Sequence, residues 1–155
     1  MEIRLAEIRD IPGMIELLKQ VGGVHHEIRP DLFRSGAQKY DEKALEDLLK
    51  DATRPIFVAV QEDSVRGYCF CIHRNYEGDS VLTDRKELYI DDLCVEETCR
   101  GQGIAQALYS RVTDYAKSCG CGYITLNVWC GNEGAMRFYE KSGFRPRSIT
   151  MERPL

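Results

Sequence analysis

The apolar residues of the N-terminal third recur at helical spacing, whereas those that follow form extended runs. Asp10 stands before Ile11-Pro12, which is typical of a helix start, and apolar residues then repeat at helical spacing as far as Val21. The pair Gly22-Gly23 is expected to end this helix. A second helix is predicted over residues 41–51, where the apolar side chains again share one face.

Extended runs dominate the middle of the chain and alternate with helical patterns toward its C-terminus. Residues 55–61 and 65–74 are rich in β-branched and aromatic side chains and are separated by polar residues, which predicts an antiparallel hairpin. After a polar loop, a strand, a helix, a strand and a helix are predicted over residues 88–95, 103–118, 123–128 and 132–142. Such an alternation requires a parallel crossover. The tail over 144–153 has room for one or two short strands.

These patterns predict a single α/β domain over residues 1–155, with a mixed, mostly antiparallel twisted sheet and helices on both faces. A chain of 155 residues buries about two-thirds of its unfolded surface, which is enough for an independent core. The net charge of −4 argues against nucleic acid or an acidic membrane surface as a partner. No apolar stretch reaches about 18 residues, and Glu2 and Arg4 open the chain where a signal peptide would be apolar. We expect a cytoplasmic protein that makes no membrane contact.

The chain has seven cysteines, an odd number, and several of them lie inside apolar strand patterns. Buried, reduced thiols are the simplest interpretation. Cys69 and Cys71 should face one side of a strand, and neither Cys-x-Cys pair has the two-residue gap of common zinc sites. We therefore expect no metal.

The segment Arg100-Gly101-Gln102-Gly103-Ile104-Ala105 follows an extended apolar run and opens a helical pattern. A strand, a glycine turn and a helix N-terminus together aim unpaired backbone N–H groups and the positive end of the helix dipole at one point. Such a junction suits a pyrophosphate, and Gly101 and Gly103 leave room for its oxygens. Arg100 either adds charge to this site or is solvated at an exposed turn.

A second motif begins at Asn132 and continues through Phe138-Tyr139 to Gly143-Phe144. Asn132, Ala135 and Tyr139 share one face of the predicted helix, and Gly143 supplies a left-handed stop. From periodicity alone, Tyr139 is a half-buried aromatic residue and Asn132 caps the helix.

Together the two motifs, Arg-x-x-Gly-x-Ala after a strand and Asn-x-x-Ala-x-x-Phe-Tyr-x-Lys-x-Gly-Phe, resemble the GNAT superfamily of acetyl-CoA-dependent N-acetyltransferases. The opening Ile3-Arg4-Leu5-Ala6 is similar to the first strand of that family, so the resemblance covers nearly the whole chain. It implies that the strands 88–95 and 123–128 splay apart and admit the pantetheine arm of acetyl-CoA, the cosubstrate. The least typical part lies between residues 22 and 40, where the family builds its acceptor side.

The resemblance also implies roles for single residues. Main-chain groups of Leu93 and Val95 would pair with pantetheine, and N–H groups from Arg100 to Ala105 would meet the pyrophosphate. Tyr139 would be the general acid that protonates the departing thiolate. The full set of cosubstrate-binding residues implied is Leu93, Val95, Arg100, Gly101, Gln102, Gly103, Ile104, Ala105 and Asn132.

The acceptor side needs a group that takes a proton, because a primary amine is mostly an ammonium ion at neutral pH. Asp91 and Asp92 lie on the central strand, and since neighbouring strand residues face opposite sides, at most one should line the cleft. Asp91 ranks first because it matches an acidic position in polyamine-acetylating relatives; either carboxylate could instead bind a cation or lie at a strand edge. His26, Arg29 and Phe33 are expected to recognise the acceptor, unless residues 25–33 are simply a polar loop.

The function that follows is acetyl transfer from acetyl-CoA to an amine by direct attack in a ternary complex. No cysteine has an identifiable adjacent base, so an acetyl-cysteine intermediate is not expected, although Cys94 and Cys130 lie near the expected cleft. The two aspartates favour a small cation, such as a polyamine or an aminoglycoside, over a protein or peptide amine. A non-catalytic acyl-CoA sensor is a further alternative, which the presence of Asn132 and Tyr139 argues against. Homodimers are common among the relatives, and the short tail could complete a sheet across subunits.

Overall fold

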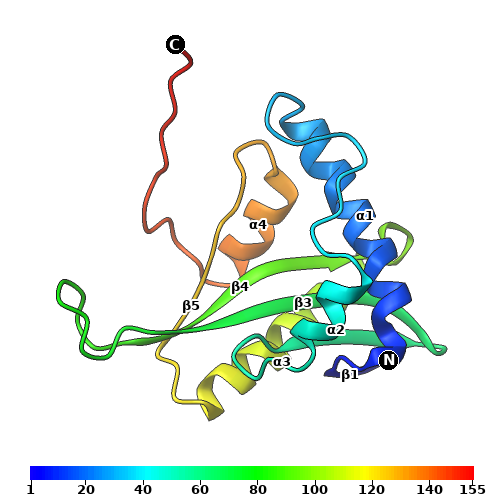
Figure 1. Cartoon of the computed structure of the whole chain (residues 1–155), viewed down its shortest axis with the longest axis horizontal. Coiled ribbons are helices and arrows are strands. Elements are labelled where there is room, and N and C mark those ends of the chain that lie inside the picture. The colour runs from blue at the N-terminus through cyan, green and yellow to red at the C-terminus, as the bar shows by residue number, and fades with distance from the viewer.

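A computed structural model describes residues 1–155 and contains one five-stranded sheet in the order β1-β2-β3-β4-β5 (Figure 1). The strands are β1 (Glu2–Leu5), β2 (Ile56–Gln61), β3 (Ser64–Asn75), β4 (Lys86–Val95) and β5 (Tyr123–Leu126). All neighbours pair antiparallel except β4 and β5, which are parallel. The mixed sheet and its single parallel pair confirm the fold predicted from the sequence.

Four helices and two short 3-10 turns complete the fold. They are η1 (Ile8–Asp10), α1 (Ile11–Ile28), α2 (Glu42–Leu48), η2 (Glu97–Cys99), α3 (Ile104–Ser118) and α4 (Glu133–Lys141). Helices α1 and α2 pack with one face of the sheet, and α3 packs with the other. The loop before α4 lies against the end of α1, where a Cβ on Gly131 would be 3.0 Å from Ile28 Cγ2.

Two apolar clusters form the core, one on each face of the sheet. The α1 face includes Met14 and Leu18, which pack with Tyr68 and Phe70 of β3. On the opposite face, apolar side chains of α3 recur at every fourth position and pack with alternate residues of β2, β3 and β4. The buried residues of this stripe are Ile104, Leu108, Val112 and Ala116. This packing holds the start of α3 close to the end of β4.

Helix α1 does not end at Gly22-Gly23, as the sequence predicted, but continues to Ile28. A Cβ on Gly22 would lie 2.1 Å from the carbonyl oxygen of Ala37, so this glycine allows the chain between α1 and α2 to cross the helix closely. The cost of a glycine in a helix interior, about 1 kcal/mol, is outweighed here by packing. His25 and His26 therefore lie in the last turn of α1.

The start of α1 also differs in detail from the prediction. Asp10 occupies the N-cap position but makes no side-chain cap hydrogen bond to α1. Its carboxylate instead accepts two hydrogen bonds from Arg4, at 2.7 and 2.9 Å, and one from the Glu7 N–H. These contacts hold the pKa of Asp10 below its usual value against the opposing effect of burial. Asp10 thus joins β1 to the turn before the helix.

The C-terminal tail forms no strand, so the prediction of one or two short strands over 144–153 was wrong. The tail stands away from the sheet (Figure 1) and leaves Ile149 and Met151 exposed. A surface hollow between the tail and β5 is lined in part by Tyr109 and Tyr123. Pro146 cannot donate the N–H that pairing with β5 would require.

One buried carboxylate ties the tail to the sheet. Glu87 of β4 is fully buried, and its Oε1 lies 2.7 Å from Arg85 Nε and 2.9 Å from Arg147 Nη1. The Thr125 hydroxyl of β5 donates to Glu87 Oε2 at 3.2 Å. A buried charge needs such partners, because an unpaired carboxylate is strongly disfavoured in a protein interior.

Replacing Glu87 by Ala should lower the free energy of unfolding by about 3 kcal/mol, because it leaves Arg85 without its buried partner. Glu133→Ala is the matched control, since it removes a Glu–Arg pair on the surface of α4, whose side chains are 80% and 65% exposed. That change should have little effect. Urea unfolding at pH 7 measures both, and equal losses would contradict the role assigned to Glu87.

Candidate functional site

The strands β4 and β5 part half-way along β4. Their pairing runs from Glu87 opposite Tyr123 to Ile90 opposite Leu126, where β5 ends. Beyond that point β4 continues to Val95 with a neighbour on one side only, β3. The remaining five residues of β4, from Asp91 to Val95, therefore have an open edge.

Backbone groups of Leu93 and Val95 face this open edge. In an antiparallel ladder, alternate residues bond to the same neighbour, and the Glu96 N–H donates to the Arg66 carbonyl at 2.8 Å. The register places Cys94 opposite Tyr68 and Val95 opposite Gly67, so the residues that bond to β3 are the even-numbered ones. The N–H and C=O groups of Leu93 and the N–H of Val95 point the other way and are available to a ligand.

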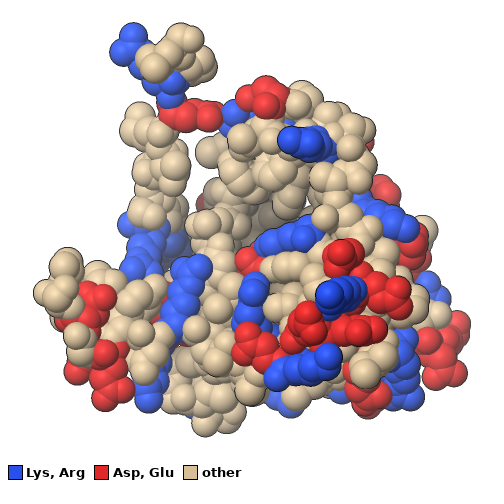
Figure 2. Space-filling view, in the orientation of Figure 1, with Lys and Arg blue, Asp and Glu red and all other residues tan.

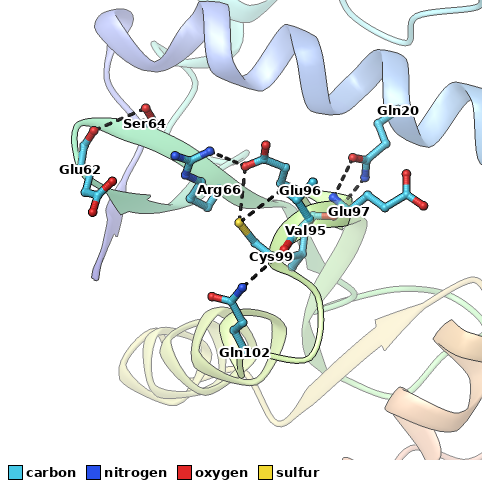
Figure 3. Close-up of polar contacts among 10 residues, drawn as sticks. Gln20, Glu62, Ser64, Arg66, Val95, Glu96, Glu97, Cys99 and Gln102 are labelled. Carbon is cyan, nitrogen blue, oxygen red and sulfur yellow. Dashed lines mark hydrogen bonds and ion pairs between the residues drawn. The ribbon is translucent and has the colours of Figure 1, made fainter.

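The turn after β4 is held in place by side chains from α1 and β3 (Figure 3). Gln20 Nε2 donates to the Val95 carbonyl at 3.0 Å, and Gln20 Oε1 accepts from the Glu97 N–H at 3.0 Å. Arg66 pairs with Glu96 at 2.6 Å across the same turn. Sequence reasoning missed Gln20, because one polar residue in an amphipathic helix carries no distinguishing pattern. Its effect is to fix the end of β4 relative to the loop that follows.

The glycine loop has the geometry that an anion site needs. Gly101 and Gly103 have φ angles of 76° and 81°, which side chains other than glycine rarely adopt, and no atom lies within 4 Å of either Cβ position. Gly103 is the N-cap of α3 and supplies no side-chain cap, so the first N–H groups of the helix stay open. Ile104 is buried beneath the loop, and Gln102 Nε2 donates back to the Thr98 carbonyl at 3.4 Å.

Arg100 is exposed beside this loop. Its Nη1 lies 4.0 Å from Glu97 Oε1, at the limit of an ion pair. The guanidinium is thus held only weakly by the chain and is free to meet an anion.

Asp91 and Asp92 lie on the same face of the sheet, so the prediction that they face opposite sides was wrong. Ile90 pairs with Cys71 and Asp92 pairs with Phe70, which leaves Asp91 as the extra residue of a β-bulge. The bulge breaks the alternation of side chains. Both carboxylates therefore meet residues of the α1 face: Asp91 contacts Tyr40 at 2.9 Å, and Asp92 contacts the Tyr68 hydroxyl at 2.9 Å.

The two carboxylates have different surroundings. Asp91 Oδ2 lies 2.8 Å from Lys39 Nζ, so its charge is balanced by a cation. Asp92 has no ion-pair partner within the chain, and burial raises its pKa to about 6, although the hydrogen bond from Tyr68 opposes the shift. A carboxyl group with this pKa exchanges a proton near neutral pH. Asp92 is therefore better suited to accept a proton. Asp91 is placed to bind a cation.

Tyr139 is buried in α4, but its hydroxyl reaches the surface. Its ring packs with Phe138 and Phe144 at centroid distances of 5.2 and 5.4 Å. The hydroxyl has no hydrogen-bond partner in the chain and is not among the fully buried side-chain atoms that lack one. Burial, with contributions from Cys69 and Asp92, raises the pKa of Tyr139 above its usual value, so the phenol keeps its proton at neutral pH.

Asn132 caps α4, because its Oδ1 accepts from the Ala135 N–H at 3.2 Å. The side-chain amide group of Asn132 is left free to donate to a ligand. The capping interpretation is confirmed, and the ligand role stays a prediction compatible with it.

The residues expected to recognise the acceptor contact one another. His26 Nδ1 donates to the Phe33 carbonyl at 2.7 Å, and Arg29 pairs with Asp31 and with Glu152 of the tail, both at 2.6 Å. The ring of Phe33 packs edge-on against Trp129, 5.0 Å away, and so joins the chain after α1 to the loop after β5. Trp129, 40% exposed, was not singled out from the sequence.

All seven cysteines are free thiols. Cys69 and Cys71 lie on one side of β3 with their sulfur atoms 3.8 Å apart, as predicted. Cys94 is buried near the open edge, and burial raises its pKa to about 12, so it holds almost no thiolate at neutral pH. No group of three or more His, Cys, Asp or Glu side chains is placed to hold a metal ion.

A strand pair that parts beside a glycine loop, with an aspartate pair and a tyrosine nearby, is the arrangement of a transferase that holds an extended acyl carrier. Residues 23–144 match the model of the Acetyltransferase (GNAT) family. The chain belongs to this family and is an acetyltransferase. The prediction from the sequence motifs is thereby confirmed.

Individual relatives agree with this result. The uncharacterized N-acetyltransferase YhdJ of Bacillus subtilis is 25% identical over 112 residues, 72% of this chain and 75% of that one. A tetramutant of the BH1408 protein from Bacillus halodurans is 32% identical, with a TM-score of 0.95 over all of both chains. An aminoglycoside N-acetyltransferase, AAC(6')-Iy in complex with CoA, is 17% identical over 99% of this chain and 100% of that one, with a TM-score of 0.71, and so shares the fold. Other curated N-acetyltransferases match over about half of their own length or less.

None of the helices combines the length and the apolar character needed to cross a membrane. Members of this family use acetyl-CoA, and the site fits it: the loop at Gly101 and Gly103 has open space, and the main-chain groups of Leu93 and the N–H of Val95 are free.

Gly103→Ala should weaken CoA binding about tenfold or more, because a Cβ at a φ of 81° strains the loop and fills the space beside the N–H groups. Gly23→Ala is the control, since a Cβ there meets nothing within 4 Å and lies in helix α1. Isothermal titration calorimetry with CoA measures both dissociation constants. Unchanged CoA binding by Gly103→Ala would contradict the assignment of the loop.

Proposed function

We propose that the protein transfers the acetyl group of acetyl-CoA to a primary amine of a small cation, by direct attack in a ternary complex. The observation that carries this proposal is the bulge in β4, which places both Asp91 and Asp92 on one face where the open edge begins. Two carboxylates there give a cationic amine one group for binding and one for proton transfer. The aminoglycoside acetyltransferase of the same fold, seen with CoA, supports the choice of cosubstrate and acceptor class.

In this proposal the chain holds acetyl-CoA mainly through its backbone. The open N–H groups at the start of α3 and the loop around Gly101 and Gly103 receive the pyrophosphate. Leu93 and Val95 pair with the pantetheine arm, as a further strand would. Arg100 adds a charge next to the phosphates, and Asn132 donates its free amide N–H.

Asp92 is the proposed proton acceptor, in place of Asp91, which the sequence ranked first. A primary amine has a pKa near ~10.4, whereas an ordinary aspartate lies near ~3.9. The pKa of Asp92, raised to about 6, lies closer to that of the amine. At ~1.4 kcal/mol per pKa unit, proton transfer from the ammonium group to Asp92 becomes less unfavourable by about 3 kcal/mol than transfer to an ordinary aspartate. Asp91, which already pairs with the ammonium group of Lys39, is the proposed binding carboxylate.

Tyr139 is the proposed general acid. Its phenol carries a proton at neutral pH, and its hydroxyl is not committed to another group of the chain. The proton moves to the sulfur as the C–S bond of the thioester breaks. Cys94 is a poor nucleophile because of its high pKa, which supports direct attack over an acetyl-cysteine intermediate.

The proposal is tested by incubating the purified protein and acetyl-CoA with separate pools of polyamines, aminoglycosides, amino sugars and peptides. Released CoA is quantified by chromatography, because the seven thiols would react with a thiol dye. Turnover in a small-amine pool supports the proposal. Turnover with peptides alone would assign a peptide acceptor instead, and CoA binding without turnover in any pool would favour a sensor.

Tyr139→Phe should lower kcat about 100-fold or more while leaving the acetyl-CoA KM unchanged, since only the proton donor is lost. Stability should change little, because the hydroxyl has no partner in the chain. Tyr109→Phe, on α3, is the matched control and should keep full activity. Equal rates for the two variants would remove Tyr139 from the mechanism.

The rate should depend on pH through Asp92. Because the deprotonated form accepts the proton, kcat/KM should rise as pH increases through about 6, the pKa of Asp92. Asp92→Asn should lower the rate and abolish this limb, whereas the exposed Asp114→Asn should retain it. A profile from pH 5 to 9 decides the matter, and an unchanged limb in Asp92→Asn would exclude Asp92 as the base.

A further inference from the structure

Lys39 lies at the carboxylate that an acceptor ammonium group would need. Its Nζ is 2.8 Å from Asp91 Oδ2, and the Tyr40 hydroxyl donates to the same oxygen at 2.9 Å. The Asp91 side chain is only 14% exposed to solvent. A cation of the chain itself therefore already occupies this carboxylate.

The backbone around Lys39 is anchored independently of this ion pair. Gln38 Nε2 donates to the Tyr40 carbonyl at 2.6 Å, and Arg54 Nη2 donates to the Tyr40 hydroxyl at 3.0 Å. The Ala37 carbonyl lies directly against Gly22 of α1. The long, flexible side chain of Lys39 can thus leave Asp91 while its backbone stays in place.

The ion pair is also of a kind that a ligand can displace. The Lys39 side chain is 42% exposed, and partly solvated pairs of this kind contribute little to stability. Basic and acidic side chains are interspersed over the α1 and α2 side of the molecule, without a large patch of one sign (Figure 2). Burial and the charge of Lys39 lower the pKa of nearby His25, which favours its neutral form, so His25 adds no second cation to compete.

Asp92 differs, because its side chain accepts from Tyr68 and has no cation of the chain within ion-pair distance. Of two neighbouring carboxylates, one is occupied by an internal ammonium group and one is open. This asymmetry matches the needs of an acceptor with two amino groups. One would bind Asp91 and the other would react near Asp92.

We propose that Lys39 is an internal competitor for the acceptor: its ammonium group occupies the binding carboxylate Asp91 until a substrate ammonium group replaces it. This inference rests on the proposed function and adds a specificity element to it. Lys39 disfavours weakly cationic ligands, and a diamine is the chemical class best able to displace it.

Removing the competitor should tighten amine binding. With spermidine as the probe, Lys39→Met should lower the dissociation constant about tenfold in calorimetry and leave CoA binding unchanged. Lys50→Met is the matched control, because it removes the same charge from a surface pair with Asp47 at the end of α2. Weaker or unchanged spermidine binding by Lys39→Met would overturn the proposal, since it would mean that Lys39 holds the ligand or does not compete.

A labelling experiment tests displacement directly and needs no turnover. Lysines are labelled briefly with an acid anhydride, and the labelled peptides are quantified by mass spectrometry. Lys39 should label severalfold faster in Asp91→Asn, and faster in the unmodified chain when spermidine is added, while Lys50 stays constant. Unchanged Lys39 labelling in both cases would refute competition. Release of Lys39 by spermidine without acetyl transfer to any amine would uphold competition and contradict the proposed function.

Discussion

The arrangement of the site depends on the point at which β4 and β5 stop pairing. Four pairs hold the two strands together, and beyond Ile90 the open edge of β4 presents the main-chain groups of Leu93 and the N–H of Val95, which nothing in the chain satisfies. Buried or half-buried N–H and C=O groups without partners are unfavourable, so an open edge inside a domain is retained where a ligand completes it. The glycine loop and the start of α3 follow directly from the same strand. The end of the β4–β5 pairing therefore supplies both the open edge of β4 and the anion site beside it.

The interactions around this opening keep it in place without filling it. Gln20 reaches from α1 to the last residue of β4 and to the turn after it, and Arg66 with Glu96 closes the same turn from β3. On the other side, Phe33 against Trp129 joins the chain after α1 to the loop after β5. A gap between two strands would otherwise collapse, because apolar side chains gain by closing it. Contacts along its rim make the open shape compatible with a stable fold.

Much of this could be predicted from the sequence, and the rest could not for identifiable reasons. Apart from the end of α1, the strands and helices were located to within one to three residues, and the glycine loop was found because Gly101 and Gly103 carry a pattern. Gly22 was misread because its role is set by a contact with Ala37, which is close in space but distant in the sequence, so that no local pattern indicates it. The bulge at Asp91 was missed because alternation is the default of any strand, and only the register with β3 breaks it. Lys39 and Gln20 act through tertiary contacts that no spacing indicates.

The bulge makes the chemistry of β4 depend on the number of its residues as much as on their identity. Residues before Asp91 and those after it alternate with opposite parity, so one extra position separates two regular half-strands. Loss of Asp91 would restore an ideal pleat and improve the ladder, yet it would leave a single carboxylate, Asp92, on the α1 face. A deletion that makes the strand more regular would thus remove the pair of carboxylates that forms the site. In this strand, the site depends on the irregular geometry itself.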